Sequence, residues 1–102
     1  MKKVTLFISR SENWNGYYLV VVNGEGFTDS VNETVAARIR GDDSWFDDRL
    51  FSIGAGGFER VFFDGTFSLA RTVHQSILNE DWGKDEIYAL ADVGGRTYKS
   101  NP

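Results

Sequence analysis

Short runs of alternating apolar and polar residues, separated by glycine-containing turns, constrain the fold of this chain more than any other feature. Val4, Leu6 and Ile8 alternate with Thr5 and Ser9 in KVTLFISR, residues 3–10, as in a strand that buries one face. YYLVVV, residues 17–22, is apolar on both faces and indicates a central strand. Further strands are expected within 34–40, 49–53, 59–63, 66–73, 86–93 and 96–100. Short strands at this spacing predict an all-β, antiparallel sandwich of about seven or eight strands.

The same pattern assigns the turns and the core. Asp64-Gly65 suits the two central positions of a type I′ hairpin turn, and the one expected helix is a short turn within 75–81. Leu19→Ala in the central strand is expected to cost about 2–5 kcal/mol, although the two faces of that strand look alike. The residues expected to be largely buried are Leu6, Ile8, Leu19, Val21, Val35, Ile39, Phe67, Leu69 and Ala91.

Size, charge and the absence of cysteine limit the class of protein. A chain of 102 residues forms one domain, residues 1–102, with a single core. Its net charge of −4 argues against binding to nucleic acid or to an anionic membrane, because both require a basic face. Without cysteine, neither a disulfide nor a thiolate metal site can form. No run of residues approaches the roughly 20 apolar residues of a membrane span, and the first residues do not form a signal peptide.

Three motifs make the chain similar to bacterial immunoglobulin-like modules of extracellular and surface proteins. VNGEGF (22–27) follows the central strand, DGTFSLARTV (64–73) opens a later strand, and DEIYALADVGGRTYKSN (85–101) contains the last two. The resemblance covers residues 17–101 and implies an immunoglobulin-like or fibronectin type III-like β-sandwich. It also implies an extracellular or cell-surface location, with neighbouring domains of a parent protein as partners. The sequence ends on SNP just past the last strand, which indicates a domain excised from or followed by other domains.

Catalytic constellations are not evident in the sequence. His74, the only histidine, has no adjacent acid or cysteine, so we expect neither a catalytic triad nor a zinc site. It also stands where the immunoglobulin-like modules often carry a proline. Arg71 interrupts the apolar alternation of 67–73, and because an unpaired buried charge is very costly we expect it at an exposed strand end. The chain is therefore not expected to be an enzyme.

Aspartates gather in GDDSWFDDRLF, residues 41–51. Calcium prefers six to eight oxygen ligands, often carboxylates from one short loop, so this segment is a candidate calcium site. The run is similar to a calcium loop of synaptotagmin-type phospholipid-binding domains. The alternative is an acidic turn, in which Asp and Ser are simply favoured. The four candidate ligands are Asp42, Asp43, Asp47 and Asp48.

The number of strands decides which loops lie together. With eight strands of alternating direction, the loops at 10–16 and 41–48 share one pole of the sandwich. The second acidic stretch, 79–85, then lies at the opposite pole. An error of one strand between 49 and 63 reverses that conclusion.

Three aromatic residues are also expected at the pole that contains residues 41–48, namely Trp14, Trp45 and Phe46. Exposed rings beside carboxylates can stack on sugars or anchor a partner; the alternative is that they cap the core. We therefore predict a non-catalytic spacer, adhesion or binding module of a larger surface protein. The alternative is a calcium- or carbohydrate-binding module that uses residues 41–48.

Overall fold

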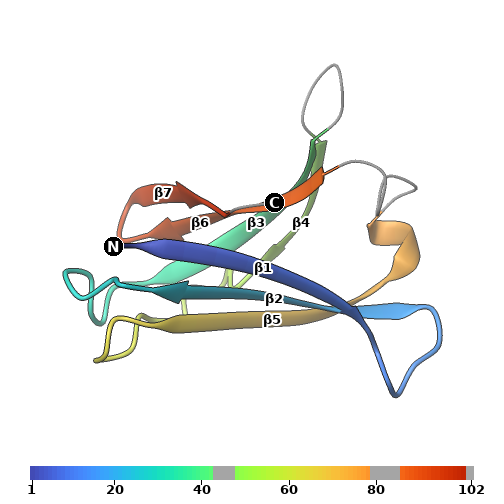
Figure 1. Cartoon of the computed structure of the whole chain (residues 1–102), viewed down its shortest axis with the longest axis horizontal. Coiled ribbons are helices and arrows are strands. Elements are labelled where there is room, and N and C mark those ends of the chain that lie inside the picture. Colours follow the sequence, from blue (N-terminus) through green and yellow to red (C-terminus); the bar gives the residue numbers. More distant parts are fainter. Residues whose placement is uncertain (43–47, 79–85, 101–102) are drawn as a thin grey trace.

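The computed structural model describes residues 1–42, 48–78 and 86–100 and confirms the all-β sandwich (Figure 1). Within these residues all strand pairings are antiparallel, and the strands form a three-stranded sheet, β1-β2-β5, and a four-stranded sheet, β4-β3-β6-β7. One short 3-10 helix, η1, follows β5, and no helix of the described part is long and apolar enough to cross a membrane. The elements are β1 (Lys3–Arg10), β2 (Tyr17–Glu25), β3 (Val35–Asp42), β4 (Asp48–Ile53), β5 (Phe67–His74), η1 (Gln75–Ile77), β6 (Glu86–Val93) and β7 (Arg96–Lys99).

The core lies between the two sheets and is formed by the inward side chains of every strand. Aliphatic residues dominate it, because β-branched side chains pack well on a pleated surface. Phe27, in the connection between β2 and β3, is its largest fully buried side chain; its ring centroid lies 5.2 Å from that of Phe67 and 5.0 Å from that of Tyr98. The fully buried residues below 2% exposure are Phe27, Ile39, Leu78, Val20, Val22, Val35, Val73 and Val93.

The predicted core is confirmed in β3, β5 and β6, is only partly buried in β1, and is wrong in β2, where the two faces are exchanged. Val22 is paired with Leu6 of β1 and with Leu69 of β5, so Val22 and Val20 face the core. Leu19 is 38% exposed on the opposite face, and Val21 is half-buried there. The expected burial of Leu19, on which the large cost of Leu19→Ala depended, is therefore wrong. Leu6 and Ile8 are partly buried against the core, and Val35, Ile39, Phe67, Leu69 and Ala91 are buried as predicted.

The segment 59–63, predicted as a strand, is not one. It makes a single isolated bridge, between Thr34 and Arg60, and then enters a turn closed by the hydrogen bond from the Gly65 N–H to the Phe62 carbonyl (2.9 Å). A type I′ turn needs positive φ at both central residues. Only Gly65 of the Asp64-Gly65 pair has it (φ 82°), so that turn prediction is wrong.

Because residues 59–63 do not form the predicted strand, the direction of every later strand is the reverse of the prediction. With seven strands, the β3–β4 and β5–β6 connections leave the sandwich at the same end. The ladder shows this directly, because Asp42 of β3 is paired with Glu86 of β6. The strand ends that flank the two acidic stretches therefore lie together and not at opposite poles as expected, while residues 43–47 and 79–85 themselves lie outside the described residues.

Arg71 faces the gap between the two sheets at their β5–β4 side. Its Nη1 donates a hydrogen bond to the Ser52 carbonyl on β4 (3.0 Å), and its guanidinium carbon lies 5.4 Å from the centre of the Phe51 ring. The residue is exposed, as expected, but within β5 and not at its end. The charged guanidinium thus stays hydrated, and its contacts with Ser52 and Phe51 connect the two sheets.

An ion pair crosses the outer face of the four-stranded sheet. Arg38 donates to both carboxylate oxygens of Asp92 (2.9 and 2.8 Å), and the Thr97 hydroxyl donates to Asp92 Oδ1 (2.7 Å). Burial by itself would raise the pKa of Asp92, but the hydrogen bonds from Arg38 and Thr97 and the charge of Arg38 hold that pKa below its ordinary value. Protonation of Asp92 therefore opposes folding.

This arrangement predicts a loss of stability in acid. Because the pKa of Asp92 is lower in the folded state, its contribution is complete above about pH 4 and is lost as the pH falls further. We expect Asp92→Asn to be less stable than the wild type at pH 7 and to lose less additional stability at pH 3. Urea unfolding at the two pH values measures both effects, and an identical acid dependence of the two proteins would contradict the assignment.

Candidate ligand-binding groove

The aspartate segment is only partly placed by the structure. Gly41 is paired with Asp48 across β3 and β4, and Asp42 is paired with Glu86, so the backbones of these three acids lie at one end of the four-stranded sheet. Asp43, Trp45, Phe46 and Asp47 lie outside the described residues. Among the residues that are described, no group of three or more acidic or histidine side chains could hold a metal ion. Calcium binding at 41–48 stays a prediction.

Trp14 belongs to the β1–β2 loop and does not cap the core. Its side chain is 62% exposed, and its ring meets Tyr17 edge to face at 5.5 Å. Tyr17 in turn meets His74 at 5.1 Å. His74 has a structural function, because its Nδ1 accepts a hydrogen bond from the Ser76 N–H (3.2 Å) at the start of η1.

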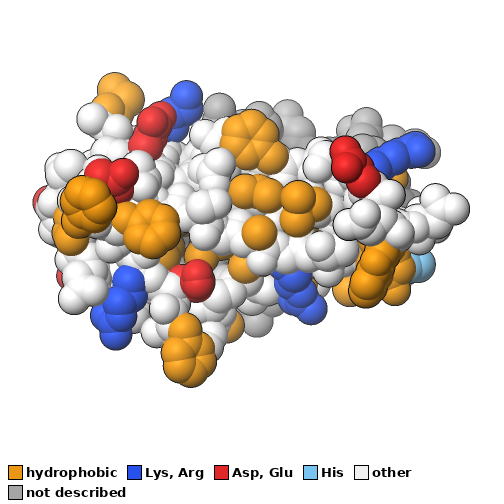
Figure 2. Space-filling view, turned by 90° about the horizontal axis from the view of Figure 1, so that it is seen from below, with side chains coloured by type: hydrophobic (Ala, Val, Ile, Leu, Met, Phe, Trp, Pro, Cys, Tyr) orange, Lys and Arg blue, Asp and Glu red, His pale blue; other side chains and the backbone are white. Residues whose placement is uncertain are grey.

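The outer face of the three-stranded sheet carries an apolar strip (Figure 2). Phe7 of β1, Val21 of β2 and Ala70 of β5 are aligned in register across the three strands, and Leu19 lies two residues farther along β2. Phe7 is 53% exposed. A sheet face that is simply solvated is usually polar, so these side chains need another explanation.

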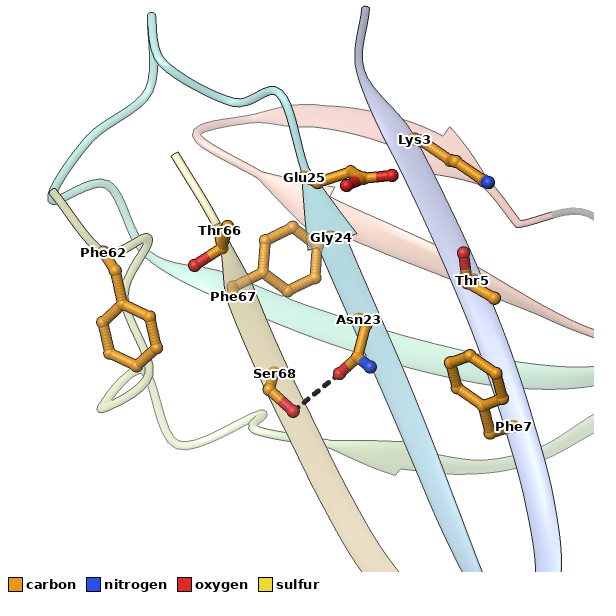
Figure 3. A pocket seen from close by; sticks show the side chains of 10 residues that line it. All are labelled: Lys3, Thr5, Phe7, Asn23, Gly24, Glu25, Phe62, Thr66, Phe67 and Ser68. Atoms are coloured by element: carbon orange, nitrogen blue, oxygen red, sulfur yellow. Dashed lines mark hydrogen bonds between the residues drawn. The ribbon is translucent and has the colours of Figure 1, made fainter. Parts of the chain in front are cut away.

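A groove opens at one end of this strip, with a phenylalanine on each side (Figure 3). Phe7 lies on the β1 side, and Phe62, from the 62–65 turn, lies beyond β5 and is 57% exposed. The volume is about 570 Å³, within the range of about 300–1,000 Å³ that is usual for ligand sites. The polar side chains that line it are Lys3, Thr5, Asn23, Glu25, Thr66 and Ser68.

Thr5, Asn23 and Ser68 form the polar floor of the groove. A hydrogen bond fixes the geometry of two of these side chains. Ser68 and Asn23 are paired across β5 and β2, and the Ser68 hydroxyl donates to Asn23 Oδ1 (2.7 Å). This bond turns the Asn23 Nδ2 toward β1 (Figure 3). The amide hydrogens of Asn23 are thereby presented to the groove between β2 and Phe7.

The turn that carries Phe62 is held rigidly. Asp64 Oδ1 accepts hydrogen bonds from the Thr66 hydroxyl (2.7 Å) and from the Thr66 N–H (3.1 Å), and these bonds lower the pKa of Asp64. The Phe62 N–H donates to the Thr66 carbonyl (2.8 Å). Phe62 is therefore positioned by backbone and side-chain hydrogen bonds before any ligand arrives.

The end of the groove carries one positive and one negative side chain. Lys3 and Glu25 are paired across β1 and β2, and their side chains both line the groove (Figure 3). The two charges compensate each other, so the lining has no net charge. Its chemistry is that of hydrogen-bonding groups between two aromatic rings.

Sequence reasoning missed this groove because its two walls come from different kinds of segment. The alternation in 3–10 already places Phe7 opposite Val4, Leu6 and Ile8, which is a usable signal. Phe62 gives no such signal, because its position depends on the turn at 62–65.

Comparison of the chain with protein-family models, with curated proteins and with solved structures finds no match.

Proposed function

We propose that the domain is a non-catalytic binding module of a larger extracellular or cell-surface protein, and that the groove on the β1-β2-β5 face is its binding surface. The observation that carries this proposal is the pair of half-exposed phenylalanines, Phe7 and Phe62, on opposite sides of a polar floor. Covering apolar surface releases about 25 cal/mol per Å². A ligand that covers both rings therefore binds with the free energy released by removing their apolar surface from water, because that surface stays exposed in the isolated domain.

The architecture supports the comparison with immunoglobulin-like and fibronectin type III-like modules. The described residues form seven antiparallel strands, divided four and three between two facing sheets. Constant-type immunoglobulin domains have the same division, but their fourth strand joins the first, second and fifth, whereas β4 joins β3, β6 and β7. Domains of this architecture serve as spacers and as adhesion or binding units. The described groove residues supply rings, hydroxyls, an amide, one amine and one carboxylate, and we assign them to binding without bond cleavage.

The proposal is tested by removing the two rings together. Phe7→Ser with Phe62→Ser should abolish retention of the labelled domain on arrays of purified surface polysaccharides and extracellular matrix proteins. The matched control is Phe58→Ser with Phe63→Ser, because these two rings are 90% and 91% exposed and do not line the groove. Thermal unfolding checks that both variants are folded.

The control variant should be retained like the wild type. No retention of the wild-type domain on any array component would contradict the proposal, as would an equal loss in both double variants. The second result would mean that exposed phenylalanines promote unspecific adsorption, wherever they lie.

A further inference from the structure

Resting on the proposed binding function of the groove, we infer that its ligand is a neutral oligosaccharide. Sugar rings lie against Phe7 and Phe62, and their hydroxyls bond to the floor between them.

The spacing of the aromatic walls favours a chain of sugars over a single one. Phe7 is on β1 and Phe62 lies beyond β5 (Figure 3), so at least two strand spacings separate them. Two spacings are about 9–10 Å. A pyranose has an apolar face of C–H groups, which packs on an aromatic face, and one ring cannot cover both phenylalanines at once.

The floor matches the edge of such a sugar. A hydroxyl group both donates and accepts hydrogen bonds. The Asn23 Nδ2 donates, and the Ser68 oxygen, whose hydrogen is used by Asn23 Oδ1, accepts. The Thr5 hydroxyl can do either. The floor therefore offers both kinds of partner within the space between the two rings.

Other ligand classes fit this lining less well. An apolar ligand such as a lipid chain would leave the Asn23 amide buried without a partner, at a cost of about 1–3 kcal/mol. An extended peptide that adds to a sheet pairs along a free strand edge, here that of β1 or β5, and would leave the Asn23 and Ser68 groups on the face of the sheet unused. A polyanion requires a positive excess, and Glu25 cancels Lys3.

The experiment uses soluble neutral hexasaccharides of glucose, mannose, galactose, xylose and N-acetylglucosamine as probes. Each is titrated into the isotopically labelled domain, and backbone amide shifts are followed. At least one probe should shift amides of β1, β2, β5 and the 62–66 turn. Phe62→Ala should weaken that binding by about tenfold or more, as expected for a ring in a binding hot spot, whereas Phe63→Ala should leave it unchanged.

Asn23→Asp sharpens the test because it changes almost no atoms. The carboxylate keeps the size of the amide and still accepts the hydrogen bond from Ser68, but the two amide hydrogens are lost and one negative charge is added to the lining. We expect affinity for the hexasaccharide to fall by about tenfold, with the fold intact in the amide spectrum. Unchanged affinity would overturn the role assigned to the floor.

The outcomes separate the ligand class from the binding function. If a matrix protein or a polyanion is retained through Phe7 and Phe62 while no neutral hexasaccharide shifts the groove amides, the oligosaccharide inference is wrong and the proposed function stands. A dimer in sedimentation that Phe7→Ser disrupts would also overturn the oligosaccharide inference, because a second copy of the domain would then cover Phe7. If nothing is retained on the arrays and no probe shifts the groove, both proposals fail.

Discussion

Phe27→Ala is expected to lower the free energy of unfolding by about 3–5 kcal/mol. The Phe27 ring is fully buried and packs on Phe67 from one sheet and Tyr98 from the other. Its N–H donates to the Gly65 carbonyl (2.9 Å), which links the β2–β3 connection to the 62–65 turn. Truncation to alanine therefore leaves a cavity at a point where both sheets and two connections meet.

Urea unfolding followed by tryptophan fluorescence measures this loss. Phe7→Ala is the matched control, because it removes the same atoms from a half-exposed position and should cost less than about 1 kcal/mol. Domains of this size are stable by only about 5–15 kcal/mol, so Phe27→Leu, which fills more of the space, is a milder variant that should remain folded. A loss below about 1 kcal/mol for Phe27→Ala would show that the ring is not central to the core.

Gly24→Ala is the second substitution for which a large loss is expected. Gly24 is paired with Phe67 across β2 and β5, and a Cβ on residue 24 would lie 2.1–2.6 Å from three atoms of the Phe67 ring. That ring is buried against Phe27 and cannot swing away without disturbing it. Overpacking of this kind costs about 1–3 kcal/mol.

A double-mutant cycle identifies the cause of that loss. Phe67→Leu removes Cε2 and Cζ, the two ring atoms that the new methyl group would approach most closely, so Gly24→Ala should cost clearly less in that background than in the wild type. The two residues are in direct contact, where coupling energies of about 0.5–3 kcal/mol are found. Additive losses would show that glycine is needed at position 24 for a reason other than the ring.

Much of the fold could be predicted from the sequence because alternation identifies strands with one buried face. β1 and the β6–β7 hairpin lie where the pattern places them. In β2 the pattern fails, because Leu19 and Val21 on one face are as apolar as Val20 and Val22 on the other. Only the register with β1 and β5, which is set by residues far apart in the chain, decides which face is buried.

The missing strand at 59–63 has a similar cause. The segment has the composition of a strand, and Val61 is buried, but its N–H donates to the Glu33 carbonyl in a connection and not to a strand. Strand propensity reports that a residue fits a half-buried surface; it does not report whether a partner strand is present. The position of Phe62, and with it the groove, could not be predicted for that reason.

The contact between Arg71 and the Ser52 carbonyl has a consequence for solubility. β4 ends the four-stranded sheet on one side, and the unpaired backbone groups of such a strand can template the addition of another chain. The Arg71 guanidinium donates a hydrogen bond to one of those carbonyls and places a positive charge beside the edge of β4. A strand from a second molecule would have to break that hydrogen bond and cover the charge before it could pair with β4. The residue that interrupts the apolar pattern of β5 thereby opposes the pairing of a second chain with β4.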